Sequence, residues 1–347
     1  MDMDGVLDSM SMWDATLGLP EQIERAAESA IALGGLPVRQ DIENIAVLGM
    51  GGSGISGDVL LAIAGPFLAV PVVVIKSYTM PAFVGPETLL FAASFSGDTE
   101  ETLEAVQIAV EQGAQVVIVT GGGELATFAE RNHLPVIHVD REIPQPRAAF
   151  GAMSIPPLVV LEEVGLFPGA THWIDLAVAQ LKRRRDQVLL SGSEPAVLAK
   201  KLVETVPVIA SSAALGAVAG FRWKAQINEN TKSPAFTTVL PETCHNELTG
   251  WEERTDLTKS SFSWVALRHD AEHPQVSRRF EIMREMLEPK LAHFLTQRAE
   301  GEGDLAQLLD LVLFGDVVSL ELAKLMRIDP GPIPVLVDLK QRLRSGE

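Results

Sequence analysis

Residues 44–54 read NIAVLGMGGSG, and this stretch decides the class of fold. An apolar run of strand length leads directly into four glycines, and a helical pattern continues over residues 59–64. A buried strand that passes through a glycine-rich turn into a helix is typical of a parallel α/β unit. The stretch therefore predicts a strand, a glycine-rich loop at 49–54 and a helix.

The same alternation of apolar runs and helical stripes extends along the rest of the chain. Further strands are expected at 70–75, 88–93, 115–120, 134–139, 207–210, 237–240 and 261–267, and helices at 19–33, 274–295 and 305–327. Most of the strands are apolar nearly throughout, which indicates parallel sheets covered by helices on both faces. We expect an α/β fold with a first subdomain over 1–150, a helical connection over 151–195 and a second subdomain over 196–347.

Composition excludes several classes of protein. The 347 residues include 46 acidic and 28 basic ones, for a net charge of −18, which disfavours general binding to nucleic acid. A single cysteine excludes an intramolecular disulfide, and the longest apolar runs are interrupted, so no membrane span is expected. The acidic start lacks an apolar signal core, which favours a cytoplasmic location. The basic run at 182–185 is interpreted as a solvated helix end.

The glycine loop fits neither of two common motifs. Its spacing matches the dinucleotide-binding fingerprint, but the next strand ends in Lys76 and Ser77 with no carboxylate to hold a ribose. The nucleophile elbow of hydrolases needs a glycine two places after Ser53, where this chain has Ile55. What remains is an anion site made of backbone amides at a helix N-terminus.

A second loop, SFSGDTEET at 94–102, strengthens this interpretation. Three hydroxyls, those of Ser94, Ser96 and Thr99, stand between an expected strand and an expected helix. An ordinary helix cap by Asp98 or Thr99 would use one of these side chains. Three hydroxyls beside a second glycine loop favour a cradle for a phosphate group.

At this point the sequence resembles a known family. The loops at 49–54 and 94–102 look like those of the sugar isomerase (SIS) fold. The segments QINEN at 226–230, PETCHNE at 241–247, GW at 250–251 and DLK at 338–340 resemble the bifunctional phosphoglucose/phosphomannose isomerases. The resemblance implies two SIS subdomains, each a flavodoxin-like three-layer sandwich. It also implies an isomerase, an intramolecular oxidoreductase, that interconverts glucose 6-phosphate, and mannose 6-phosphate, with fructose 6-phosphate through an enediolate.

The resemblance also assigns roles to residues. Glu229 would be the base that moves the proton, and a partly buried carboxylate between two asparagines suits that task. His245 would assist ring opening in the partner subunit, which implies a homodimer, and Lys340 would share that step. Arg147 would steady the enediolate. The phosphate and sugar would be bound by Gly51, Gly52, Ser53, Ser94, Ser96 and Thr99.

Two alternatives stay open, and two departures from the family pattern stand out. The chain could be a non-catalytic SIS sensor of a sugar phosphate, or an isomerase of a related aminosugar phosphate. Cys244 precedes the histidine where a polar residue is expected, and Gly331 stands where relatives often have threonine. No cofactor is expected, because the carboxylate that a dinucleotide site needs is missing. No metal is expected, because Pro274 disfavours a regular helix around the histidine pair at 269 and 273 and the family that the chain resembles is metal-independent.

Overall fold

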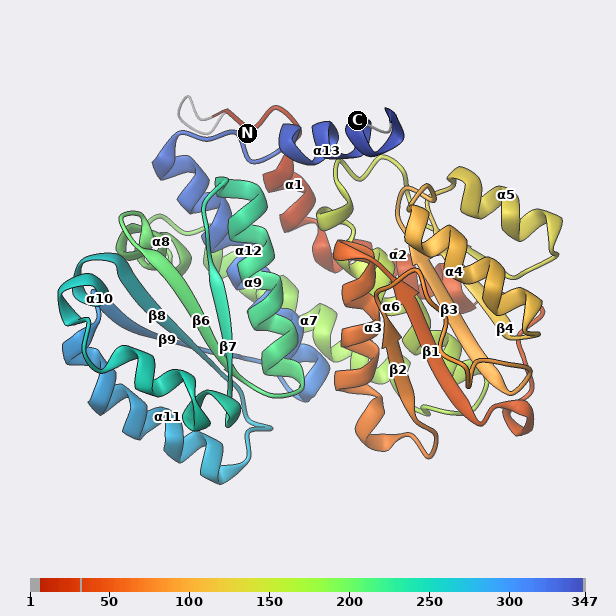
Figure 1. Ribbon diagram of the computed structural model, residues 1–347, viewed down its shortest axis with the longest axis horizontal. Helices are drawn as coiled ribbons and strands as arrows, with labels where there is room; N and C mark the ends of the chain where they lie inside the picture. Colours follow the sequence, from red (N-terminus) through yellow and green to blue (C-terminus); the bar gives the residue numbers. More distant parts are fainter. Residues whose placement is uncertain (1–6, 32, 346–347) are drawn as a thin grey trace.

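The computed structural model describes residues 7–31 and 33–345. Two parallel sheets lie on either side of a central layer of helices, and further helices cover their outer faces (Figure 1). This arrangement confirms the α/β class expected from the alternating pattern.

The first sheet has five parallel strands in the order β2-β1-β3-β4-β5, the order of flavodoxin-like sheets. Its strands are β1 (Asn44–Gly49), β2 (Val72–Ile75), β3 (Thr88–Ser94), β4 (Gln115–Thr120) and β5 (Val136–His138). Along β1, Ile45 and Val47 face the central helices, whereas Ala46 and Leu48 face a second core under the outer helices. The helices of this half are α1 (Met12–Leu17), α2 (Leu19–Ile31), α3 (Gly51–Ile63), α4 (Glu100–Glu111), α5 (Gly123–Arg131) and α6 (Phe150–Glu163).

The second sheet repeats this order with four strands, β7-β6-β8-β9. They are β6 (Val206–Ser212), β7 (Phe236–Leu240), β8 (Phe262–Arg268) and β9 (His293–Arg298). The helices that precede or cover it are α7 (Ala170–Val188), α8 (Glu194–Leu202), α9 (Leu215–Thr231), α10 (Thr255–Ser261), α11 (Pro274–Leu287), α12 (Asp304–Met326) and α13 (Pro334–Ser345).

Helices α9 and α12 form the middle of the central layer. They cross closely at Gly315, where an added Cβ would lie 2.1 Å from Nε1 of Trp223. That indole N–H donates to the carbonyl oxygen of Leu311 at 2.7 Å, so the buried tryptophan is fully satisfied. This close contact holds the middle of α9 against α12, and Glu229 lies six residues farther along the same helix.

The basic run at 182–185 differs from its sequence interpretation. Arg184 is buried, and its guanidinium forms two hydrogen bonds to the carboxylate of Asp310 on α12, at 2.8 and 2.9 Å. Gln180 and the backbone amide of Glu300 donate to the same carboxylate. The prediction of a wholly solvated helix end was wrong for Arg184, because an acidic partner 126 residues away in the chain compensates its charge.

We expect Asp310→Ala to lower the free energy of unfolding by about 3–5 kcal/mol, because it leaves the guanidinium of Arg184 buried without its partner. Urea denaturation followed by circular dichroism measures this loss. Asp338→Ala on α13 is the matched control, since its pair with Arg342 is exposed on both sides and worth about 1 kcal/mol or less. Equal effects of the two substitutions would contradict the prediction.

The helix predicted over 274–295 was wrong at its end. Helix α11 ends at Leu287, Pro289 interrupts the chain, and β9 adds the fourth strand in parallel beside β8. In β9 the more buried and more exposed side chains mostly alternate, as expected of an edge strand. The glycine loop is also shorter than predicted, since α3 begins at Gly51.

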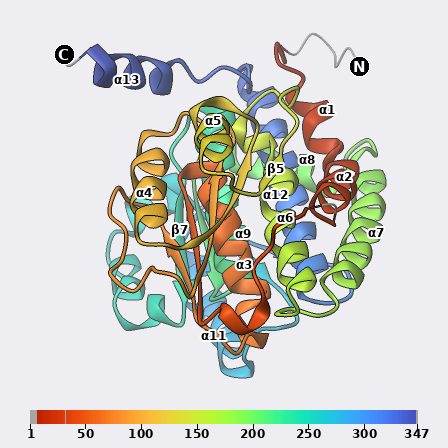
Figure 2. The same ribbon diagram turned by 90° about the vertical axis from the view of Figure 1, so that its right-hand side faces the viewer.

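The C-terminal helix α13 extends away from the rest of the molecule (Figure 2). Its apolar side chains, Val335, Leu336, Val337, Leu339 and Leu343, are exposed. Within residues 7–31 and 33–345, no helix has the length and apolar character needed to cross a membrane. The subdomain limits near residues 150 and 195 stay a prediction.

Candidate active site

The two loops predicted to bind phosphate lie next to each other at one edge of the first sheet. They follow β1 and β3, the neighbouring strands between which the strand order reverses. In open α/β sheets this switch point is where ligands bind, beyond the carboxyl ends of the strands. The backbone N–H of Phe95 donates to Oγ of Ser53 at 3.0 Å and joins the two loops.

Glycines allow the first loop to approach its surroundings closely. A Cβ on Gly54 would lie 2.6 Å from the carbonyl oxygen of Gly49, so α3 starts directly at the end of β1. Gly51 has a φ of +52° and open space where a Cβ would be. The backbone amides at the start of α3 therefore face the site with no side chains in front of them, an arrangement that favours binding of an anion.

The hydroxyls of the second loop are held in place by local hydrogen bonds. Oγ of Ser94 lies 2.9 Å from Oγ1 of Thr99 and accepts from the backbone N–H of Gly97 at 3.1 Å. Thr99 precedes the first residue of α4, but its side chain makes no capping bond to that helix. Asp98 accepts instead from the amide of Glu124. The ordinary-cap alternative therefore does not account for Thr99.

Ser96 differs from the other two hydroxyl residues. It is exposed, and its Oγ accepts from the backbone N–H of Asp98 at 3.2 Å. Ser94 and Ser53 are buried and Thr99 is half-buried. The structure thus brings Ser53, Ser94 and Thr99 together, with Ser96 at the outer rim of the same turn.

Arg147 lies beside this cradle and connects it to the second half of the chain. A Cβ on Gly52 would lie 3.3 Å from the carbonyl oxygen of Pro146, which immediately precedes Arg147. The Arg147 side chain is buried, with 3% of its surface exposed, and its Nη1 lies 3.3 Å from Oε2 of Glu229. Burial lowers the pKa of Arg147, while the carboxylate of Glu229 acts to raise it. A guanidinium remains charged under these conditions, so the site holds a fixed positive charge beside a carboxylate.

Three further groups hold the Arg147 guanidinium. Its Nε donates to Oδ1 of Asn230 at 2.9 Å, and Nη2 donates to the carbonyl oxygens of Pro330 and Gly331 at 2.6 and 2.8 Å. Asn230 donates in turn to Oγ of Ser319 on α12. Segments far apart in the sequence thus fix one side chain, which leaves it little freedom to rotate.

Glu229 stands at the end of α9 with 31% of its side chain exposed. It is therefore accessible to a small molecule, while Asn230 beside it is fully buried. An accessible carboxylate next to a fixed guanidinium can accept a proton from carbon while the guanidinium stabilises the resulting enediolate.

His245 lies far from Glu229 within the chain, although only 16 residues separate them. It is exposed in a 3₁₀ turn (Glu242–His245) that follows β7. The C-terminal end of β7 pairs with that of β6, next to the start of α9. Glu229 is 14 residues along α9, or about 20 Å from its start at 1.5 Å per residue. One chain alone does not bring these two side chains together.

Lys340 is likewise exposed, on the protruding helix α13 (Figure 2). Helix α13 begins three residues after Gly331, so it leaves the site at the loop that accepts from Arg147. The structure places Lys340 on an element connected to the site but does not bring its side chain to Glu229.

Cys244 and Gly331, the two residues that depart from the family pattern, each make close contacts with a methionine. Cys244 is half-buried with Sγ 3.6 Å from Sδ of Met283, and burial raises the pKa of its thiol. A Cβ on Gly331 would lie 2.7 Å from Cγ of Met10, so Met10 occupies the space that a larger side chain at 331 would need. Gly331 and Met10 are therefore packed as a pair.

A buried ion pair that holds the backbone of Arg147 was not predicted from the sequence. Arg222 on α9 donates to the carbonyl oxygen of Arg147 at 2.6 Å and pairs with Asp316 on α12 at 2.7 Å. All three side chains are buried. Two charges placed within otherwise apolar helical stretches are the signal that could have identified this pair.

The histidines at 269 and 273 do not share a helix. His269 follows β8 and its Nε2 lies 2.5 Å from Oγ of Ser212, whereas His273 caps α11.

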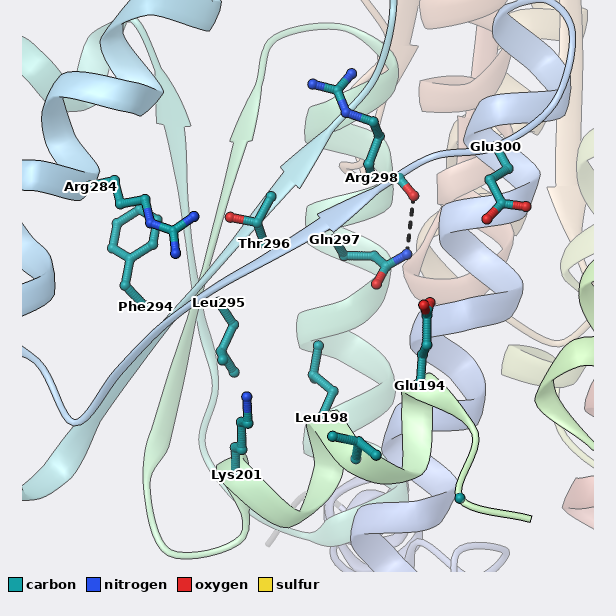
Figure 3. A pocket seen from close by; sticks show the side chains of 12 residues that line it. Glu194, Leu198, Lys201, Arg284, Phe294, Leu295, Thr296, Gln297, Arg298 and Glu300 are labelled. Carbon is teal, nitrogen blue, oxygen red and sulfur yellow. Dashed lines mark hydrogen bonds between the residues drawn. The ribbon is translucent and has the colours of Figure 1, made fainter. Parts of the chain in front are cut away.

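A separate cavity of about 580 Å³ lies at the open edge of β9, between α8 and α11 (Figure 3). Lys201, Arg284 and Thr296 line it, and it contains none of the predicted site residues.

Comparisons with known proteins match both halves of the chain to described domain families. The family described as "SIS domain" matches residues 40–154, and "Bacterial phospho-glucose isomerase C-terminal SIS domain" matches residues 192–343. A bifunctional phosphoglucose/phosphomannose isomerase of Caldicellulosiruptor bescii is 34% identical over 96% of this chain and 98% of its own length. The protein of that name from Aquifex aeolicus is 33% identical over 87% of this chain and 91% of its own.

A solved structure supports the fold independently. A hypothetical protein from Thermus thermophilus superposes with a TM-score of 0.71 at 16% identity, over 99% of this chain and 92% of that one. Two matched domains, relatives similar over nearly their full length, and the arginine–glutamate pair beside a hydroxyl cradle lead to one assignment. The chain belongs to the family of bifunctional phosphoglucose/phosphomannose isomerases.

Proposed function

We propose that this protein interconverts glucose 6-phosphate and mannose 6-phosphate with fructose 6-phosphate. The observation that carries the proposal is the contact of the Glu229 carboxylate with the buried Arg147 guanidinium, next to the phosphate cradle. Glucose and mannose 6-phosphates differ only at C2, so both pass through the same enediolate. One base that exchanges a proton between C1 and C2 serves both substrates when the open chain turns about the C2–C3 bond, because the C2 hydrogens of the two epimers lie on opposite faces of that enediolate.

In this mechanism the phosphate is bound by Ser53, Ser94, Ser96 and Thr99, and the amides of Gly51 and Gly52 line the sugar. Glu229 removes the proton from C2 of the open aldose and returns it to C1, and the proton of the C2 hydroxyl passes to the C1 oxygen, which leaves the ketone at C2. Arg147 compensates the negative charge that builds up on the enediolate oxygens, and its fixed position means that little reorganisation is needed.

The same proposal includes a homodimer in which His245 of the partner subunit and Lys340 assist ring opening. A cavity of about 560 Å³ between α3 and α9 supports it, because Leu61 and Phe221 line it and both are exposed. Two α9 helices that pack antiparallel across this face would place the His245 end of one chain beside Glu229 of the other. The exposed apolar side chains of α13 offer further surface for the second copy. A cytoplasmic location belongs to the same proposal.

A coupled assay tests the activity. Purified protein is given fructose 6-phosphate, and formation of glucose 6-phosphate and mannose 6-phosphate is followed separately, with and without a chelator. We expect turnover to both products, unchanged by the chelator. Binding without turnover would favour a sugar-phosphate sensor, and turnover of aminosugar phosphates alone would favour the related isomerase.

We expect Ser94→Ala to raise KM for fructose 6-phosphate about tenfold, the equivalent of one hydrogen bond to a charged group. The hydroxyl of Ser94 organises Thr99 and Gly97 and stands where phosphate would bind. Because the base is untouched, kcat should fall far less. Steady-state kinetics measure both constants, and Ser29→Ala on α2 is the exposed control. An unchanged KM would remove Ser94 from the phosphate site.

A further inference from the structure

Lys232 is the residue that directly follows α9, and its amine turns back onto the end of that helix. Its backbone is left-handed, with a φ of +56°, so the chain reverses there. Nζ donates to the carbonyl oxygen of Glu229 at 2.8 Å. A cation at a helix C-terminus satisfies carbonyls that have no partner within the helix.

The same amine reaches the loop that precedes α13. It donates to the carbonyl oxygen of Asp329 at 2.8 Å and to that of Pro330 at 3.2 Å. The Pro330 carbonyl also accepts from Nη2 of Arg147 at 2.6 Å. Lys232 and Arg147 therefore share one acceptor, and the loop at 329–331 lies between them.

These contacts connect the base, the guanidinium and the loop into one unit. The Asp329 carboxylate strengthens the loop by accepting from the backbone N–H of Gly331 at 3.1 Å. Burial lowers the pKa of Lys232, as does the positive charge of Arg147, while Asp329 and Glu229 act in the opposite direction. The three charged groups that shift this pKa thus belong to the site or to this loop.

We infer that Lys232 is a positioning residue for the isomerisation, which holds Glu229 in reach of the substrate carbon by tying the end of α9 to the loop at 329–331. The inference rests on the proposed function. The amine binds the backbone of Glu229 and leaves its carboxylate available, so it acts on where the base lies. Proton transfer depends strongly on that placement, since an error of about 1 Å costs about a hundredfold in rate.

The test compares Lys232→Met and Lys232→Arg with the unchanged protein. Methionine keeps the side chain except for its terminal amine and so removes its donors, and we expect kcat to fall between about tenfold and a hundredfold. KM should stay within about threefold, because the phosphate cradle is built from other residues. Arginine restores donors and charge, and we expect it to recover much of the lost kcat.

Lys201→Met, on α8 in the cavity of Figure 3, is the matched control for loss of a surface charge. Lys232 is itself exposed, so Lys232→Met should fold; circular dichroism checks this, and Lys232→Gln replaces it if it does not. An unchanged kcat, a rise in KM alone, or no recovery with arginine would overturn the inference. Failure of the unchanged protein to turn over fructose 6-phosphate would instead reject the proposed function.

Discussion

Glu229→Gln is expected to lower kcat at least about a thousandfold, within the range that a positioned base contributes. Glutamine has the same size and can still accept a hydrogen bond from Nη1 of Arg147, which lies 3.3 Å from the carboxylate. It cannot take a proton from carbon. The coupled assay with fructose 6-phosphate measures the loss of turnover.

Binding separates this effect from damage to the site. Because the phosphate cradle and Arg147 stay in place, calorimetry with fructose 6-phosphate should give a Kd within a few-fold of that of the unchanged protein. Glu130→Gln on α5, an exposed glutamate, is the matched control and should retain full activity. Activity of Glu229→Gln within tenfold of the original would show that another group is the base.

The second large effect concerns His245 and the partner subunit. We expect His245→Gln and Glu229→Gln to be nearly inactive alone, and their 1:1 mixture, after subunit exchange, to recover about a quarter of full activity. Half of the dimers would then be mixed, and each mixed dimer would contain one site with both the original glutamate and the original histidine. This follows only if the two residues of a site come from different chains.

A double variant provides the control for this experiment. When Glu229→Gln/His245→Gln is mixed 1:1 with the unchanged protein, every mixed dimer has one defect in each site, so only about a quarter of all sites stay active. Sites made within one chain would leave about half active. No recovery in the first mixture and half activity in the second would contradict the shared site.

Much of the fold could be predicted because short stretches of sequence, such as apolar runs and glycines at tight turns, are enough to specify strands and the turns that follow them. The run at 45–48 is apolar throughout, and these residues of strand β1 are buried on both faces as that pattern indicates. Gly54 lies so close to the carbonyl oxygen of Gly49 that the Cβ of any other residue would clash with it. The edge strand β9 was missed because its six residues alternate only in part, so the helical pattern of α11 was extended over them, whereas pairing with β8 makes them a strand.

In the candidate site, too, some residues could be predicted from the sequence and others could not. Ser53, Ser94 and Thr99 could be identified together because each lies at the carboxyl end of a strand or within five residues of it, and parallel strands end at one edge. Lys232 could not be identified from the sequence, because the role proposed for it depends on hydrogen bonds to Asp329 and Pro330, which follow about 100 residues later. Hydrogen-bond partners at such distances leave no periodic signal in the sequence.

The sequence by itself determined the strand–turn–helix units, their parallel order and the hydroxyl-lined loops, because backbone conformation and burial are set by neighbouring residues. Only the tertiary structure decided which charges are compensated. Arg147 meets Glu229 and Pro330, and Arg184 meets Asp310, across separations of 82 to 183 residues. A buried charge is stable only beside its partner, and that partner is chosen by how helices and loops pack in three dimensions.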